Sequence, residues 1–149
     1  MVSENLKLSA TSDEDLRVIS AHLQDSITQI ANIAHLKKNK IFLIQFNRFM
    51  WEDVEKGVFR KNRRIQSIFK LENVLSVYSK NLNQKKKNRF LGFLAIESKQ
   101  LFDKSYEITF HFAGNMLIKV NAEVIDCFLD DQGESWKTKN KPKNNLFDD

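Results

Sequence analysis

The fold is decided in residues 106–122, which read YEITFHFAGNMLIKVNA. Ile108, Phe110 and Phe112 alternate there with polar side chains, and this period of two is typical of a strand that buries one face. Residues 113–115, Ala-Gly-Asn, separate this run from a second alternating run. Gly and Asn are residues that tight hairpin turns favour. The stretch therefore predicts a β-hairpin and, with it, an antiparallel sheet.

Further strands are predicted on the N-terminal side of this hairpin. Phe42, Ile44 and Phe46 share one face of an apolar, β-prone run. The isoleucine spacing in residues 27–36 would also suit a helix, but the β-branched content favours an irregular strand. Residues 65–80 form one long strand, or two that are interrupted near Glu72 and Asn73. The predicted strands are ITQIANIAHL (27–36), KIFLIQFNRFMW (40–51), IQSIFKLENVLSVYSK (65–80) and FLGFLAIES (90–98).

A helix is predicted to begin after Ser12. Ser12 is a suitable N-cap, Asp15 occupies the third helical position of a capping box, and three acidic residues in the first turn complement the helix dipole. Leu16, Ile19 and Leu23 then recur at helical spacing, which predicts the buried face of this helix.

A second helix is predicted over residues 123–133, EVIDCFLDDQG, and Gly133 is placed to end it. Its apolar stripe would consist of Val124, Ile125, Phe128 and Leu129. The expected fold is α+β: a mostly antiparallel sheet of six to seven strands, or a partly closed barrel, with an N-terminal and a C-terminal helix. A pleckstrin-homology-like barrel closed by the C-terminal helix is one candidate. We expect a single domain over residues 1–136 and a polar, flexible tail over residues 137–149.

Composition narrows the class of protein. The chain of 149 residues has a formal net charge of +5 and one cysteine, Cys127, which cannot form an internal disulfide. A reducing compartment follows from this, and we expect a cytoplasmic protein. No apolar run approaches the roughly 18 residues of a membrane-spanning helix, and the first ten residues lack the apolar core of a signal peptide. We therefore expect no membrane insertion, and the residue spacing predicts neither a cofactor nor a metal site.

Two basic segments suggest an acidic partner. The alternate turns of a meander lie at the same end of a sheet, so these segments should be neighbours and form a basic rim, whereas the loop with Arg60, Lys61, Arg63 and Arg64 should lie at the opposite end. Lys and Asn are abundant throughout the chain, however, and an AT-rich coding bias would explain the same charge without any binding. The predicted rim consists of Lys37, Lys38 and Lys40 in the first segment and Lys85, Lys86, Lys87 and Arg89 in the second.

Five polar and aromatic residues form a candidate pocket or binding site. His22 and Asp25 are three residues apart on the predicted first helix, and a carboxylate can orient an imidazole for base catalysis. Arg48, Trp51 and Glu52 end a predicted strand, where a guanidinium can stack on an indole and still bind a carboxylate. The chain has no catalytic motif such as H-E-x-x-H, C-x-x-C or G-x-S-x-G. The structural alternative is favoured: His22 packs at the edge of the core, with Asp25 capping or pairing nearby. Trp51 would then cover the edge of the sheet, with Arg48 and Glu52 paired in solvent.

Four stretches resemble the signature segments of a proteobacterial family, domain of unknown function 2948. They are DLRVISAHLQDS (15–26), NRFMWE (47–52), FLGFLAIES (90–98) and FAGNMLIKVNAEVIDCFLDDQGESW (112–136). The family tends to have Gly-Pro before the last tryptophan and a second Gly in the hairpin, where this chain has Glu134-Ser135 and Asn115. The resemblance implies a small cytoplasmic bacterial protein, and it implies no catalytic or binding residue.

These observations leave three classes of function. We expect a non-enzymatic binding or adaptor module with a protein partner, because the recognisable features define a fold and no catalytic set is visible. The first alternative is an RNA- or ribosome-associated protein that uses the basic loops to bind RNA or another acidic surface. The second is an enzyme with His22, Asp25, Arg48 and Glu52 in one pocket, which would require these side chains to converge.

Overall fold

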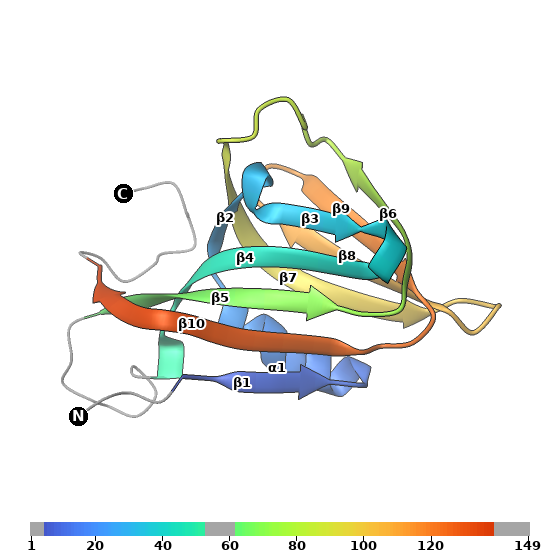
Figure 1. Cartoon of the computed structure of the whole chain (residues 1–149), viewed down its shortest axis with the longest axis horizontal. Coiled ribbons are helices and arrows are strands. Elements are labelled where there is room, and N and C mark those ends of the chain that lie inside the picture. The colour runs from blue at the N-terminus through green and yellow to red at the C-terminus, as the bar shows by residue number, and fades with distance from the viewer. Residues whose placement is uncertain (1–4, 53–61, 139–149) are drawn as a thin grey trace.

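The structure, a computed structural model, describes residues 5–52 and 62–138. In these two ranges the chain forms ten strands and one α-helix (Figure 1). All the strand pairs are antiparallel, in the order β1-β10-β5-β4-β2-β7-β8-β9-β6, and β3 pairs with β4 beside β2. The elements are β1 (Lys7–Ala10), α1 (Asp13–Leu23), β2 (Ile27–Gln29), the 3-10 turn η1 (Ile30–Asn32), β3 (Ile33–Leu36), the 3-10 turn η2 (Lys37–Asn39), β4 (Ile41–Phe49), β5 (Arg63–Leu71), β6 (Val74–Lys80), β7 (Phe90–Gln100), β8 (Tyr106–Phe112), β9 (Met116–Ala122) and β10 (Cys127–Lys137).

The predicted hairpin is confirmed. Strands β8 and β9 pair from Phe112–Met116 to Tyr106–Ala122. Gly114 and Asn115 in the turn both have positive φ, at 84° and 60°. Asn tolerates this left-handed conformation better than most residues with a side chain. Asn115 therefore makes the turn without the second glycine.

The first helix is also confirmed, with its cap and its buried face. The Asp15 backbone N–H donates to Ser12 Oγ at 3.2 Å, and the Thr11 backbone N–H donates to Asp15 Oδ2 at 3.1 Å. The apolar stripe of Leu16, Ile19 and Leu23 is buried. Helix α1 packs chiefly against β7 and also contacts β1 and β4.

The predicted C-terminal helix is wrong, because most of its residues belong to β10. In this strand Cys127, Leu129 and Asp131 are buried, with Phe128 and Asp130 between them more exposed. Strand β10 pairs with β1 on one side and with β5 on the other. Neighbouring strands supply partners for its backbone along its length, which outweighs a short apolar stripe at helical spacing. The helix that would close a pleckstrin-homology-like barrel is therefore absent from the described part of the chain.

The sheet has more strands than the predicted six or seven. Residues 65–80 divide into β5 and β6 at Asn73, which has a φ of 59°. Two backbone hydrogen bonds hold this reversal: Glu72 N–H donates to the Asp126 carbonyl, and Glu123 N–H to the Asn73 carbonyl, both at 2.9 Å. Residues 27–36 form β2, η1 and β3, so the predicted irregular strand is interrupted by a 3-10 turn.

One hydrophobic core lies inside the curled sheet. Phe110 contacts both Phe42 and Phe69, with ring centroids 5.5 and 5.2 Å apart, and Phe93 contacts Phe46 at 5.5 Å. These rings come from β4, β5, β7 and β8, which are distributed across the strand order. The sheet therefore curls around its apolar face, but among the described residues it is not closed, since β3 and β6 each pair on one side only.

Lys137 is the last residue of β10, and the Thr138 N–H donates to the Asn62 carbonyl at 2.9 Å. The rest of the predicted tail lies outside the described residues. Within those residues, no helix is long and apolar enough to cross a membrane, and no group of three or more His, Cys, Asp or Glu side chains could hold a metal ion. Cys127 is buried, and this burial raises the pKa of its thiol to about 12.

Candidate functional site

Arg48 lies in a closed network of ionic hydrogen bonds. Its side chain has no exposed surface. Its Nε and Nη2 donate to Asp131 at 2.8 and 2.7 Å, and its Nη1 and Nη2 donate to Glu52 at 2.9 and 2.7 Å. Asp131 also accepts hydrogen bonds from the Ser67 hydroxyl and, at 2.8 Å, from the Leu6 backbone N–H. The network joins β4, β5, β10 and the segment before β1.

The electrostatics of this network favour the ionised forms of its carboxyl groups. Burial alone would raise the pKa values of Asp131 and Glu52, but the hydrogen bonds and positive charge of Arg48 outweigh burial and hold both values below their usual range. Both carboxyl groups are therefore ionised at neutral pH, and Arg48 has no surface with which to contact a substrate. The network is a structural clamp. Arg48 and Glu52 pair with each other, as the structural alternative expects, but Arg48 is fully buried and the pair does not lie in solvent.

The predicted candidate pocket assembles only in part. His22, Trp51 and Glu52 line a shallow pocket of about 320 Å³ against the outer side of α1. Trp51 Nε1 donates to the Gln24 carbonyl at 2.8 Å, so the indole caps the end of the helix. His22 Nδ1 is buried and has no hydrogen-bond partner within residues 5–52 and 62–138.

Asp25 lies apart from this pocket. It follows α1 with a φ of 62°, and its carbonyl faces Arg64 Nη1 at 3.5 Å. Burial raises the pKa of Asp25, and the charge of Arg64 partly opposes the rise. Of the four residues that the enzyme alternative requires to converge, only Arg48 and Glu52 are joined by hydrogen bonds in the described part of the chain.

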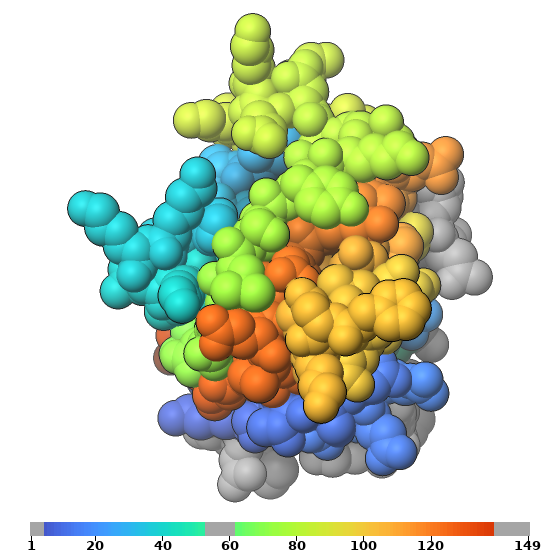
Figure 2. Space-filling model, turned by 90° about the vertical axis from the view of Figure 1, so that its right-hand side faces the viewer, coloured from blue at the N-terminus to red at the C-terminus, as the bar shows by residue number. Residues whose placement is uncertain are grey.

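The two basic segments are not neighbours, so the predicted basic rim does not form as one surface. The Val74 N–H donates to the Lys40 carbonyl at 2.9 Å, at the start of β6. The second segment follows the other end of β6, and its Lys87 carbonyl accepts from the Ala31 N–H at 3.0 Å. Figure 2 shows residues 37–40 in cyan at the left and residues 81–89 in olive at the top. The prediction assumed two strands between the basic segments, which would place both segments at the same end of the sheet. The reversal at Asn73 adds a third strand, so the segments lie at opposite ends.

The described arginines of the third basic loop have hydrogen-bond partners within the protein. Arg64 is buried and donates to the Asn47 carbonyl at 3.1 Å. Arg63 Nη1 donates to Ser135 Oγ at 3.2 Å. Arg60 and Lys61 lie outside the described residues. The two described arginines are thus occupied within the sheet.

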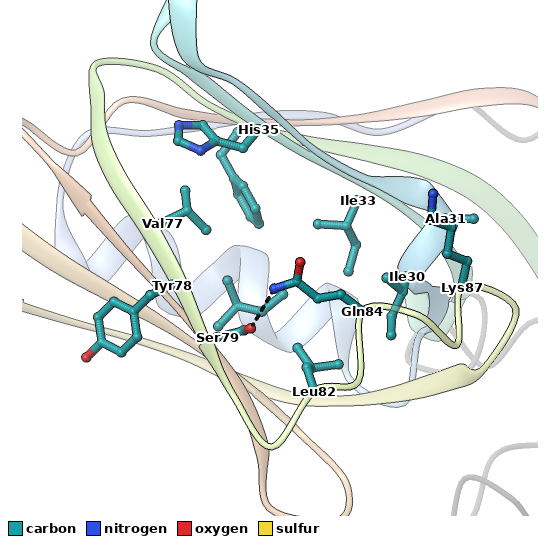
Figure 3. Close-up of a pocket in the computed structure, with 12 residues that line it drawn as sticks. Ile30, Ala31, Ile33, His35, Val77, Tyr78, Ser79, Leu82, Gln84 and Lys87 are labelled. Carbon is teal, nitrogen blue, oxygen red and sulfur yellow. Dashed lines mark hydrogen bonds between the residues drawn. The ribbon is translucent and has the colours of Figure 1, made fainter.

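A larger pocket lies where the sheet fails to close, between β3 and β6 (Figure 3). We call it the β3–β6 pocket; its volume is about 530 Å³. The two strands form its sides, the Lys40–Val74 backbone hydrogen bond closes one end, and the Ala31–Lys87 hydrogen bond closes the other. Its lining consists of Ile30, Ala31, Ile33, His35, Phe42, Val77, Tyr78, Ser79, Leu82, Gln84, Lys87 and Ile118.

The lining is mostly apolar. Phe42 and Ile118 belong to the hydrophobic core, and aliphatic side chains from η1, β3, β6 and the following loop surround them. Gln84 Nε2 donates to Ser79 Oγ at 3.4 Å, across the space between the two strands (Figure 3). Burial, with a contribution from Lys37, lowers the pKa of His35, so its imidazole is neutral at pH 7. The Tyr78 ring points away from the pocket in Figure 3.

This pocket was not predicted from the sequence. Its nearest signal was the ambiguity of residues 27–36, where the isoleucine spacing fits neither a regular strand nor a clear helix. Ile30 and Ile33 line the pocket because η1 interrupts the strand between them. Nothing local indicates that β6 lies opposite them, since the loop at 81–89 and the strand order decide that.

Comparisons with known proteins bear on family and not on activity. Neither the curated proteins nor the solved structures include a match to this chain. One family model matches residues 6–144, and its description is protein of unknown function, DUF2948. That match covers nearly the whole chain, including the hairpin, helix α1 and both strands that carry the Arg48–Asp131 pair. The chain therefore belongs to the DUF2948 family.

Proposed function

We propose that this protein is a non-enzymatic binding module that takes a small, largely apolar molecule in the β3–β6 pocket. The observation that carries the proposal is a pocket of about 530 Å³ at the open seam of the sheet, with apolar side chains of the core at its base. Small-molecule sites in proteins are concave, mostly apolar and about 300–1,000 Å³ in volume. The lining also contains no carboxylate and no thiol. It includes His35, Tyr78, Ser79 and Lys87, but no hydrogen bond joins any two of these four side chains in the described part of the chain, as an activated nucleophile and its base would require.

The boundaries of the pocket favour a small ligand over an extended peptide. A peptide that added to the edge of β6 would have to pass along the strand. Backbone hydrogen bonds close both ends of the space, at Lys40–Val74 and at Ala31–Lys87. The protein partner expected from the sequence would then act elsewhere on the surface. The separation of the basic segments likewise removes the continuous basic surface on which the RNA alternative depended.

Nile red, a neutral dye whose fluorescence rises in apolar surroundings, tests the proposal. We expect saturable fluorescence enhancement with the wild-type protein. Val77→Phe and Ile33→Phe place larger side chains in the lining and should each weaken the affinity by about tenfold, which corresponds to 1.4 kcal/mol. Leu75→Phe is the matched control, because Leu75 is exposed on the same strand as Val77 and lies outside the lining.

Thermal melts of all three variants would show that they remain folded. Absence of saturable enhancement with the wild-type protein would contradict the proposal. Equal affinity of the wild type and both lining variants would also contradict it, because the dye would then bind at another surface.

A further inference from the structure

Cations outnumber acidic residues around the β3–β6 pocket. The lining contains Lys87 and no acidic residue. At the η2 end, Lys40 pairs with Glu123 at 3.5 Å. Lys37, Lys38, Lys85, Lys86, Lys87 and Arg89 make no ion pair with the described part of the chain. A pocket with cations at both ends, of which Glu123 compensates one, has a positive potential, which favours a negatively charged ligand.

Hydrogen-bond donors gather in the part of the lining next to the 81–89 loop. Ser79 ends the inner side of β6, and Gln84 and Lys87 come from the loop that follows. The Gln84–Ser79 hydrogen bond is long, at 3.4 Å, and Gln84 is exposed, so a ligand could replace it at little cost. Figure 3 shows Lys87 beside Ala31, at the end where the loop meets η1. Amide, hydroxyl and ammonium groups together suit a carboxylate.

The remaining lining suits a hydrocarbon chain. Phe42 and Ile118 are buried core residues, and Ile30, Ile33, Val77 and Leu82 are partly buried side chains packed against that core. An anion placed among them would lose its hydration without compensation, whereas an anion at the loop would remain beside water and Lys87. The pocket therefore has an apolar floor and a cationic rim.

We infer that the ligand is an anionic amphiphile, a monocarboxylate with a hydrocarbon chain, whose chain lies on Phe42 and Ile118 and whose carboxylate binds at Ser79, Gln84 and Lys87. This inference rests on the proposed function and specifies the ligand class of the same site. Lys87 is its charge-selecting residue.

Displacement of Nile red by three ten-carbon compounds tests the charge. Decanoate, decanol and decylammonium share a chain and differ in the head group, and each is used below its micelle concentration at low salt. We expect decanoate to displace the dye at the lowest concentration and decylammonium at the highest. Lys87→Gln should weaken decanoate binding by about fivefold, the upper range for an exposed ion pair, and leave decanol unchanged.

Lys86→Gln is the matched control, because Lys86 is the neighbouring lysine and is not part of the lining. Lys87→Arg keeps the charge and should retain the preference for decanoate, which separates an effect of charge from a defect in the loop. Equal displacement by decanoate and decanol, or an unchanged decanoate affinity in Lys87→Gln, would overturn the inference. In both cases Nile red still binds, so the proposed function would stand; a failure of the proposed function shows instead as loss of the dye signal itself.

Discussion

At the scale of single residues, the buried charge of Arg48 is stabilised by two carboxylates, Glu52 and Asp131, which are far apart from each other in the sequence. Asp131 is 83 residues away along the chain, and the pair is fully buried. Removal of one partner from a buried ion pair leaves an uncompensated charge, which costs far more than the pair itself contributes. The serine hydroxyl and backbone N–H that bind Asp131 would lose their ionic acceptor at the same time. We therefore expect this network to govern stability rather than activity.

Asp131→Asn should lower the free energy of unfolding by about 3–5 kcal/mol at pH 7, because Arg48 then loses its fully buried counter-charge and keeps only the carboxylate of Glu52. Denaturant unfolding measures this loss. Asp130→Asn, one position away and on the more exposed side of β10, is the control and should change little. A loss below 1 kcal/mol in Asp131→Asn would mean that water reaches Arg48.

The carboxyl groups of Asp131 and Asp25 have pKa shifts of opposite direction, so their contributions to stability change with pH in opposite ways. The pKa of Asp131 is lowered in the folded state, so its contribution is present above the unfolded value of about 3.9 and is lost as pH falls through the folded pKa. The pKa of Asp25 is raised, chiefly by burial, so its ionisation opposes folding above that same unfolded value.

Asp25→Asn should therefore keep or raise the melting temperature at pH 7, and the difference from wild type should shrink at pH 3, where Asp25 is protonated. Asn also suits the φ of 62° at this position. Thermal melts of both proteins at the two pH values test this. If Asp25→Asn instead lowered the melting temperature relative to wild type at pH 7 but not at pH 3, the charge of Asp25 would stabilise the fold through Arg64.

At the scale of elements, α1 contributes through its buried stripe and its cap. Leu23 is fully buried in the core that the curled sheet encloses. The Ile96 backbone N–H donates to Ser20 Oγ at 3.1 Å, which joins the same helix to β7. Helix α1 is therefore part of the core and not a peripheral addition to the sheet.

Leu23→Ala should lower the free energy of unfolding by about 2–5 kcal/mol, because it leaves a cavity between α1 and the sheet. Val18→Ala on the exposed side of the same helix is the control and should be nearly neutral. Thermal and denaturant unfolding check both. An unchanged midpoint for Leu23→Ala would mean that the helix can detach from the sheet without loss of the core.

At the scale of the whole molecule, the strand order creates both the core and the pocket. Strand β10 comes late in the chain and inserts between β1 and β5, while β6 lies at the other end of the order, beside β9. The curl then brings β6 opposite β3, where two backbone hydrogen bonds connect the edges but leave about 530 Å³ between them. The proposed site is thus a property of the closure of the sheet and belongs to no single motif.

The sequence by itself determined the features that depend on near neighbours. Ser12 and Asp15 cap α1 across three residues, and alternation with Gly114 and Asn115 makes the β8–β9 hairpin, because these interactions need only local geometry. Only the tertiary structure decided which of two local possibilities prevailed elsewhere. Residues 127–137 became a strand since β1 and β5 offered backbone partners, the reversal at Asn73 separated the basic segments, and Arg48 found Asp131 across 83 residues. Such choices depend on the free energy of non-local pairing and burial, which no short stretch of sequence contains.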